Sequence, residues 1–145
     1  MKLLIATNRT LVDVALLLLR LTVGVILFVV GAGKVLGWFG GQGMQATVQG
    51  FATMGIPASL TYLSSYTEFI GGALLAVGLW TRPAALLITI NMLVATYVML
   101  PGGFFLGGAA YPFTLGVVSL AILLAGPMAY SMDAWMLKQC SRGTA

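Results

Sequence analysis

Three residues that could do polar chemistry lie inside long apolar stretches of this chain, namely Arg20, Glu68 and Asn91. A charged side chain at the centre of a bilayer costs about 2.5–3.5 kcal/mol on insertion scales, so such residues face a protein interior and find partners. Arginine donates hydrogen bonds, a carboxylate accepts them or takes a proton, and an amide does both. We therefore predict a polar pocket that holds an anionic or quinone-like group, or that relays a proton.

Two alternatives compete with this pocket. Arg20 and Glu68 differ in predicted depth by about 6 Å at 1.5 Å per helical residue, which an arginine side chain can reach. They could form a buried ion pair that only fixes helix register. Side chains lean toward the N-terminus of their own helix, however, so a direct pair requires Arg20 to turn against this lean, or a bridging water or ligand. The other alternative is that the charges extend to the membrane surface.

The composition indicates that this protein lies in a lipid bilayer. Of its 145 residues, 60% are hydrophobic and 7% are charged, against about 25% charged in soluble domains. A soluble domain of this size needs more polar residues to cover its surface. This excludes a water-soluble enzyme, a nucleic-acid-binding module and a disordered chain. We expect one transmembrane domain over residues 1–145, with the lipid bilayer as its partner.

Several reaction types are excluded by residues that the chain lacks. It has no histidine, a single cysteine (Cys140) and only three acidic residues, Asp13, Glu68 and Asp133. Imidazole catalysis, an intrachain disulfide and a zinc site are therefore absent, and three scattered acids cannot form a hard-metal cage. We expect no catalytic set and no metal site, so that redox chemistry would require a borrowed cofactor.

The elements that must position these residues are membrane-spanning helices, each of which needs about 20 residues. Four apolar stretches qualify, near residues 11–36, 60–80, 84–100 and 112–129. Thr81-Arg82-Pro83 predicts a tight turn between the second and third spans, because proline disfavours helix at and before its position. The predicted fold is all-α, a four-helix transmembrane bundle. Asp13 and Arg20 interrupt the first stretch, which argues against a cleaved signal peptide.

Two shorter helices are expected outside the bundle. Met44, Val48, Phe51 and Met54 recur at helical spacing in the first loop, which predicts a short interfacial helix on the outer side. The alternative is a loop that simply covers the end of the bundle. In the tail, residues 130–145, a surface helix is predicted after Ser131, which has the right side chain for an N-cap.

The distribution of basic residues predicts the orientation. One side of the predicted bundle carries Lys2, Arg9, Arg82, Lys138 and Arg142, and the other carries Lys34 alone. Basic loops stay in the cytoplasm, so both termini are predicted to be cytoplasmic. The expected interface anchors are Trp38 and Lys34 on the outer side, and Trp80 and Trp135 on the inner side.

Small residues recur every three or four positions in the predicted spans. The stripes are Arg20, Gly24, Leu27 and Gly31 in the first span; Ser64, Glu68, Gly72 and Ala76 in the second; and Gly116, Ser119, Leu123 and Gly126 in the fourth. Small residues allow transmembrane helices to approach closely, so these stripes place Arg20 and Glu68 at helix–helix contacts.

The order of several motifs is informative as a set. They read Arg20-Leu21-x-x-Gly24-x-x-x-Phe28-x-x-x-Ala32-x-Lys34, Gly37-Trp38-Phe39-Gly40-Gly41, Phe51-x-x-Met54-Gly55-Ile56-Pro57, Glu68-x-x-Gly71-Gly72-x-Leu74-Leu75-x-x-Gly78-Leu79-x-Thr81-Arg82 and Gly126-Pro127-x-x-Tyr130-Ser131-x-Asp133. From Leu11 to Asp133 the chain resembles the DoxX-like family of small four-span membrane proteins. Arg20, Lys34 and Glu68 match the polar positions of that family.

The resemblance implies a function of limited detail. Some relatives are the small membrane subunit of a thiosulfate:quinone oxidoreductase, and others are linked to membrane-associated thiol and oxidative-stress systems. By this resemblance we expect a bacterial inner-membrane subunit of an oxidoreductase or electron-transfer assembly, with a quinone-facing pocket. The expected partners are other membrane subunits or further copies of the chain. The alternatives are a structural accessory subunit and a small-solute or proton pathway.

The chain also departs from the family pattern. Many relatives have a histidine near the end of the third span and an acid at the start of the fourth. Here these segments, residues 97–101 and 109–112, contain neither group. This departure favours a docking or stabilising subunit over a relay that needs both groups.

Overall fold

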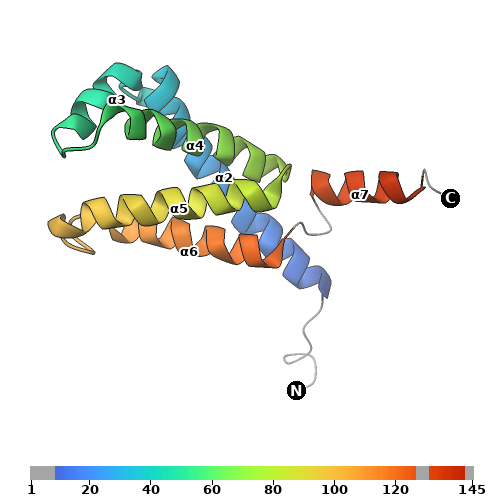
Figure 1. The fold of residues 1–145 in the computed structure, drawn as a ribbon. Helices are drawn as coiled ribbons and strands as arrows, with labels where there is room; N and C mark the ends of the chain where they lie inside the picture. Colours follow the sequence, from blue (N-terminus) through green and yellow to red (C-terminus); the bar gives the residue numbers. More distant parts are fainter. Residues whose placement is uncertain (1–8, 127–130, 143–145) are drawn as a thin grey trace.

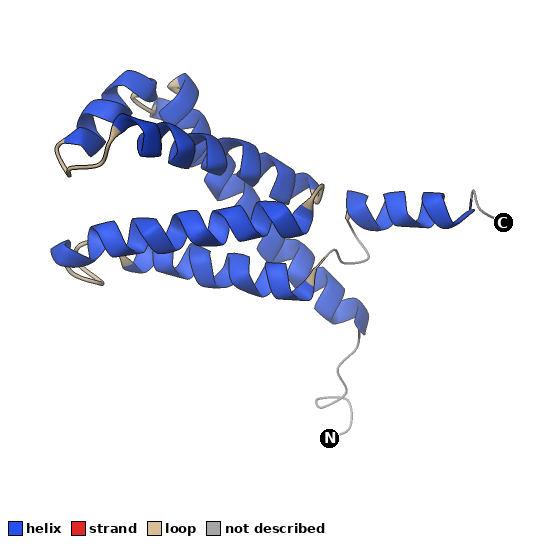
Figure 2. Ribbon diagram, viewed as in Figure 1, coloured by secondary structure: helices blue, strands red, loops and turns tan. Residues whose placement is uncertain are grey.

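The computed structural model describes residues 9–126 and 131–142 (Figure 1). Over these residues it contains helices and no strands (Figure 2), which confirms the predicted all-helical class. The elements are α2 (Arg9–Leu36), η1 (Trp38–Gly40), α3 (Gly43–Ala52), α4 (Ala58–Val77), α5 (Thr81–Met99), η2 (Leu100–Gly102), α6 (Ala110–Ala125) and α7 (Met132–Arg142).

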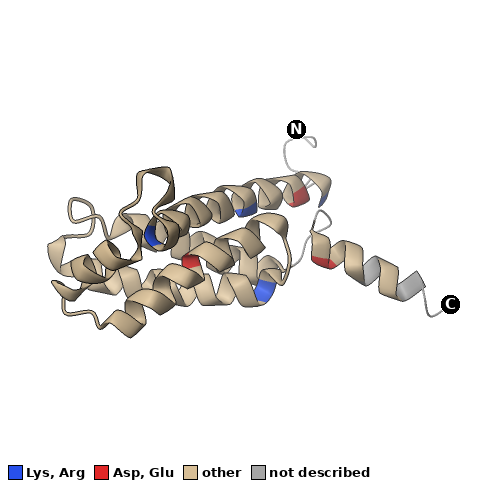
Figure 3. Cartoon of the chain, turned by 90° about the horizontal axis from the view of Figure 1, so that it is seen from above, with Lys and Arg blue, Asp and Glu red and all other residues tan. Residues whose placement is uncertain are grey.

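The four long helices form two packed pairs. Helix α2 packs against α4, α5 packs against α6, and α4 joins the two pairs through α5. Helix α3 lies across one end of this bundle, which we call the α3 end. Helix α7 projects from the opposite end, which we call the α7 end (Figure 1). Charged residues are few along the helices (Figure 3).

Glycines on α2 and α4 allow the backbones of these helices to touch. A Cβ atom on Gly24 would lie 2.6 Å from the backbone nitrogen of Ala76, and one on Gly72 would lie 2.5 Å from that of Phe28. A Cβ on Gly31 would overlap the backbone of Phe69. The predicted small-residue stripes of the first two spans are therefore confirmed as a contact surface.

The packed core lies between the two helix pairs, while many large apolar side chains face outward. The core residues are Val23, Leu27, Leu75, Ala85, Ile88, Met92, Leu115 and Ile122. Among the described residues, α2 and the stretch Thr81–Gly102 are long and apolar enough to cross a membrane, and α6 is a shorter apolar helix. An exposed apolar surface around a packed core is expected of a protein whose solvent is lipid.

The turn between α4 and α5 lies three residues earlier than predicted. Gly78, with φ of 76°, ends α4, and Trp80, with φ of 49°, precedes α5. Thr81, Arg82 and Pro83, predicted to form the turn, are the first turn of α5. Proline is tolerated there because the N–H groups of a first helical turn have no acceptor within the helix.

Both short helices form where they were expected. Helix α3 covers Met44, Val48 and Phe51 of the periodic pattern. The Ser131 hydroxyl accepts a hydrogen bond from the backbone N–H of Ala134 at 3.1 Å, which confirms Ser131 as the N-cap of α7. Residues 127–130 and 143–145 of the predicted tail lie outside the described residues.

Candidate functional site

The central feature of the bundle is an ion pair between Lys34 and Glu68. The Lys34 Nζ atom donates a hydrogen bond to Glu68 Oε2 at 2.6 Å. The side chain of Glu68 is 5% exposed and that of Lys34 is 23% exposed. Lys34 lies in the last turn of α2, and the close contact of Gly31 with Phe69 brings that turn beside Glu68 on α4. Lys34, expected as an interfacial anchor, is therefore the partner of the buried carboxylate.

Arg20, which was expected at this site, lies at the α7 end of the bundle. Its guanidinium packs against Gly78, where a Cβ atom would come within 2.5 Å of a terminal nitrogen. Gly78 follows Glu68 by ten residues along α4 and its C-cap, which corresponds to about 15 Å. The hypothesis that Arg20 pairs with Glu68 is therefore wrong, because the register of α2 against α4 places Lys34 opposite Glu68.

Asn91, the third predicted pocket residue, lies at the same level of the bundle as Glu68. Gly71 on α4 faces Ile88 on α5, and a Cβ on Gly71 would lie 3.2 Å from the Ile88 side chain. Because α4 and α5 are antiparallel, one turn further places Glu68 and Asn91 at one level. The Asn91 Nδ2 atom is buried and has no hydrogen-bond partner among the described residues. Two of the three predicted pocket residues, Glu68 and Asn91, therefore lie at one level of the bundle, with no hydrogen bond between them in the described structure.

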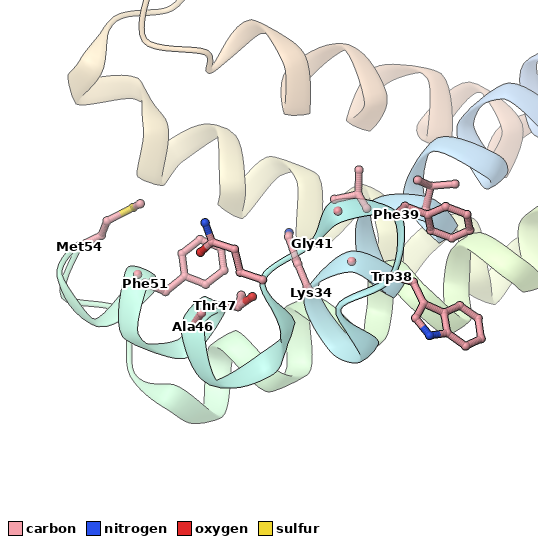
Figure 4. A pocket seen from close by; sticks show the side chains of 14 residues that line it. Lys34, Trp38, Phe39, Gly41, Ala46, Thr47, Phe51 and Met54 are labelled. Carbon is pink, nitrogen blue, oxygen red and sulfur yellow. The ribbon is translucent and has the colours of Figure 1, made fainter.

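A cavity of about 450 Å³ adjoins Lys34 at the α3 end. Its walls come from the last turns of α2, from η1 and from α3, as Figure 4 shows around Lys34. The lining residues are Val29, Val30, Gly33, Lys34, Trp38, Phe39, Gly40, Gly41, Gln42, Ala46, Thr47, Gly50, Phe51 and Met54. The Lys34 Nζ atom lies 5.6 Å from the centre of the Phe51 ring, a cation–π distance.

Tyr111 is a polar residue within electrostatic range of the site that the sequence analysis did not single out. It lies in the first turn of α6, and its phenol is close enough to Glu68 for the carboxylate charge to act on it. In the sequence, Tyr111 could have been noticed by its position at the start of the predicted fourth span, where many members of the resembled family have an acidic residue. Its side chain is 53% exposed and does not line the cavity beside Lys34.

The chemistry of this arrangement follows from its charge balance. A lysine ammonium has three N–H donors, and Glu68 accepts one of them. The remaining donors are available to an oxygen acceptor in the cavity. Because the pair is neutral as a whole, an anionic ligand would be attracted by Lys34 and repelled by Glu68. The arrangement therefore suits a neutral carbonyl group better than an anion.

A second polar cluster lies at the α7 end and is structural. Asp133 accepts hydrogen bonds from the backbone N–H groups of Trp80 at 2.9 Å and Thr81 at 2.8 Å. Burial acts to raise the pKa of Asp133, but the hydrogen bonds from Thr81 and Trp80 and the charge of Arg20 outweigh it and hold the pKa below its usual value. A carboxylate on α7 thus caps the N-terminus of α5.

Replacing Asp133 by alanine should lower the free energy of unfolding at neutral pH by about 0.5–2 kcal/mol, the usual cost of losing an N-cap. Because the folded pKa lies below the unfolded value of about 3.9, the contribution is complete above that value and is lost as the pH falls through the folded pKa. Thermal unfolding in detergent at pH 7 and pH 3 checks this. A gap between wild type and Asp133→Ala that is as large at pH 3 as at pH 7 would contradict it.

Comparison with known proteins places the chain in a family. The DoxX family model matches residues 15–101. The chain belongs to the DoxX family. Curated relatives include the Bacillus subtilis protein named "Putative oxidoreductase CatD", 30% identical over 131 residues, which cover 90% of this chain and 93% of that one. Another is "Inner membrane protein YqjF" of Escherichia coli, 29% identical over 135 residues, which cover 90% of this chain and 98% of the relative. No solved structure matches.

The extent of the DoxX match bears on the site. Lys34, Glu68 and Asn91 lie inside the matched segment, whereas Tyr111 and Asp133 lie beyond it. The ion pair and all three walls of the cavity, α2, η1 and α3, thus belong to the part of this DoxX-family membrane protein that the family model describes.

Proposed function

We propose that this DoxX-family protein is an integral subunit of an oxidoreductase or electron-transfer assembly in the bacterial inner membrane, and that it holds a quinone head group beside Lys34. The observation that carries this proposal is the Lys34–Glu68 ion pair next to a cavity. The names of the two relatives, one a putative oxidoreductase and the other an inner membrane protein, support a role in redox chemistry and a place in the inner membrane.

The proposed topology has four spans, formed by α2, α4, α5 and α6. Arg9 and Arg82 lie at the α7 end of these helices, Lys138 and Arg142 belong to α7, and Lys2 precedes Arg9 in the sequence. Lys34 lies toward the α3 end and is neutralised by Glu68. Basic residues favour the cytoplasmic side, so both termini are cytoplasmic and the α3 end faces outward.

A quinone suits this site for two reasons. Its carbonyl oxygen can accept one of the Lys34 N–H donors that Glu68 leaves available. Its planar ring can lie among the aromatic and apolar side chains that line the cavity, which include Phe51 and Met54. Reduction or oxidation of a quinone also moves protons, and Glu68, bonded to Lys34, provides a group that can exchange them. The electrons pass to or from a partner subunit.

Filling the cavity tests the proposal. Gly50 lines the cavity, and a side chain there would meet open space. We expect Gly50→Leu to weaken the binding of decylubiquinone at least tenfold in detergent, while the melting temperature is unchanged or higher because glycine disfavours helix. Gln45→Leu is the matched control, since Gln45 lies on the same helix, is exposed and does not line the cavity.

Mass spectrometry of the purified protein distinguishes the competing functions. Co-purified quinone that is lost in Lys34→Met supports the proposed site. Partner subunits without quinone would support a structural accessory role. Absence of both, together with proton or solute flux in liposomes, would support a pathway through the bundle. Equal quinone binding by wild type, Gly50→Leu and Lys34→Met would refute the site.

A further inference from the structure

We infer that the ligand reaches this cavity sideways from the lipid phase, and that the site selects an amphiphile whose apolar tail extends along α2. The inference rests on the proposed function, because it concerns the ligand of the same site. It adds a substrate class, a molecule with a neutral polar head and a membrane-soluble tail, and it adds a route. Three features of the cavity carry it.

The first feature is a gradient of polarity along the cavity. Lys34, Gln42 and Thr47 supply polar groups at the α3 end. Val29 and Val30 line the same cavity but precede Lys34 by five and four residues on α2. At 1.5 Å per residue they lie about 6–7.5 Å further toward the middle of the bundle. In the proposed topology, one cavity therefore extends from the depth of the lipid head groups toward the hydrocarbon region.

The second feature is the aromatic wall formed by η1. Trp38 is 57% exposed and Phe39 is 68% exposed, although both line the cavity. Phe39 has φ of 56°, a left-handed conformation that non-glycine residues rarely adopt and that persists only when the surroundings impose it. Those surroundings include Gly41, whose backbone packs directly on Gly33 of α2. The fold thus holds two aromatic rings outward at the flank of the cavity, where a membrane interface favours them.

The third feature is the uncharged character of the wall on the aqueous side. Helix α3 bears Gln45 and Gln49 on its exposed face and no acidic or basic residue. A charged rim would steer a soluble, charged substrate to the cavity, and α3 provides none. A ligand dissolved in the bilayer, in contrast, is already concentrated beside Trp38, Phe39 and Val30. The lipid side is therefore the route that the chemistry of the walls favours.

Two quinones that share a head group test this inference. They are decylubiquinone and 2,3-dimethoxy-5-methyl-1,4-benzoquinone, which lacks the tail. Binding is followed in phosphatidylcholine vesicles by quenching of Trp38 fluorescence, with Trp80→Phe and Trp135→Phe as the background. With both quinones expressed as mole fraction in the lipid, we expect at least tenfold tighter binding of decylubiquinone.

A polar substitution on the tail path provides the second measurement. Val30→Gln should reduce the advantage of decylubiquinone to less than threefold and leave the tail-free quinone unaffected. Val94→Gln is the matched control, because Val94 is an exposed valine of α5 that does not line the cavity. If wild type binds both quinones with equal mole-fraction affinity, the site holds no tail and the inference fails, while the proposed quinone site stands. If wild type binds neither quinone, the proposed function itself fails.

Discussion

Lys34→Met should lower the free energy of unfolding by about 3–5 kcal/mol, the cost of leaving one member of a buried ion pair without its partner. The Glu68 side chain is 5% exposed and would remain as an uncompensated carboxylate. Glu68→Met should cost less, because Lys34 is 23% exposed and its flexible side chain can extend to the membrane surface. Reversible denaturation in mild detergent measures both values.

The double variant Lys34→Met/Glu68→Met separates the cost of a stranded charge from the value of the pair. Its free energy of unfolding should be within about 1 kcal/mol of the wild-type value, or higher than that value. The reason is that replacing a buried pair by apolar residues of similar size is often neutral or stabilising. Quinone binding should nevertheless be lost in the double variant. If the losses in free energy of unfolding caused by the two single substitutions add up in the double variant, the two side chains do not act as a pair.

Gly31→Ala should destabilise the protein by about 3 kcal/mol, because overpacking a close contact forces the backbone to move. The added methyl group would overlap the backbone of Phe69, so α2 and α4 must separate at that level. Separation there also moves Lys34 away from Glu68, so quinone binding should fall together with stability. Melting temperature and decylubiquinone affinity in detergent provide the two measurements.

Gly50→Ala is the control for this prediction. A Cβ atom on Gly50 would meet open space, and alanine favours helix over glycine by about 1 kcal/mol. Its melting temperature should be unchanged or higher. If Gly31→Ala behaved like Gly50→Ala, the close approach of α2 and α4 would not determine stability.

Features that repeat along one helix could be predicted from the sequence. The apolar stretches, the small-residue stripes with Gly24, Gly31 and Gly72, and the Ser131 cap all arise from local spacing. The glycines have a direct physical reading, because only a residue without Cβ permits backbones to touch. These patterns suffice for an all-helical class and for the contact between α2 and α4.

The identity of the site required the register between helices, which local spacing does not determine. Arg20 and Lys34 both lie on α2, separated by nearly four turns, and either could have been the partner of Glu68. The contact of Gly31 with Phe69 decides in favour of Lys34. Trp80 and Thr81 likewise find their acceptor in Asp133, 53 and 52 residues away, a distance beyond any pattern within a single helix.

That long-range cap has a consequence for biogenesis. The N–H groups that begin α5 receive their carboxylate only from a residue made some fifty positions later. Because α5 is synthesised before Asp133, these N–H groups lack this acceptor until α7 has been made. The cap on α5 therefore forms only after α7 has been synthesised, so this contact is completed late in the folding of the bundle.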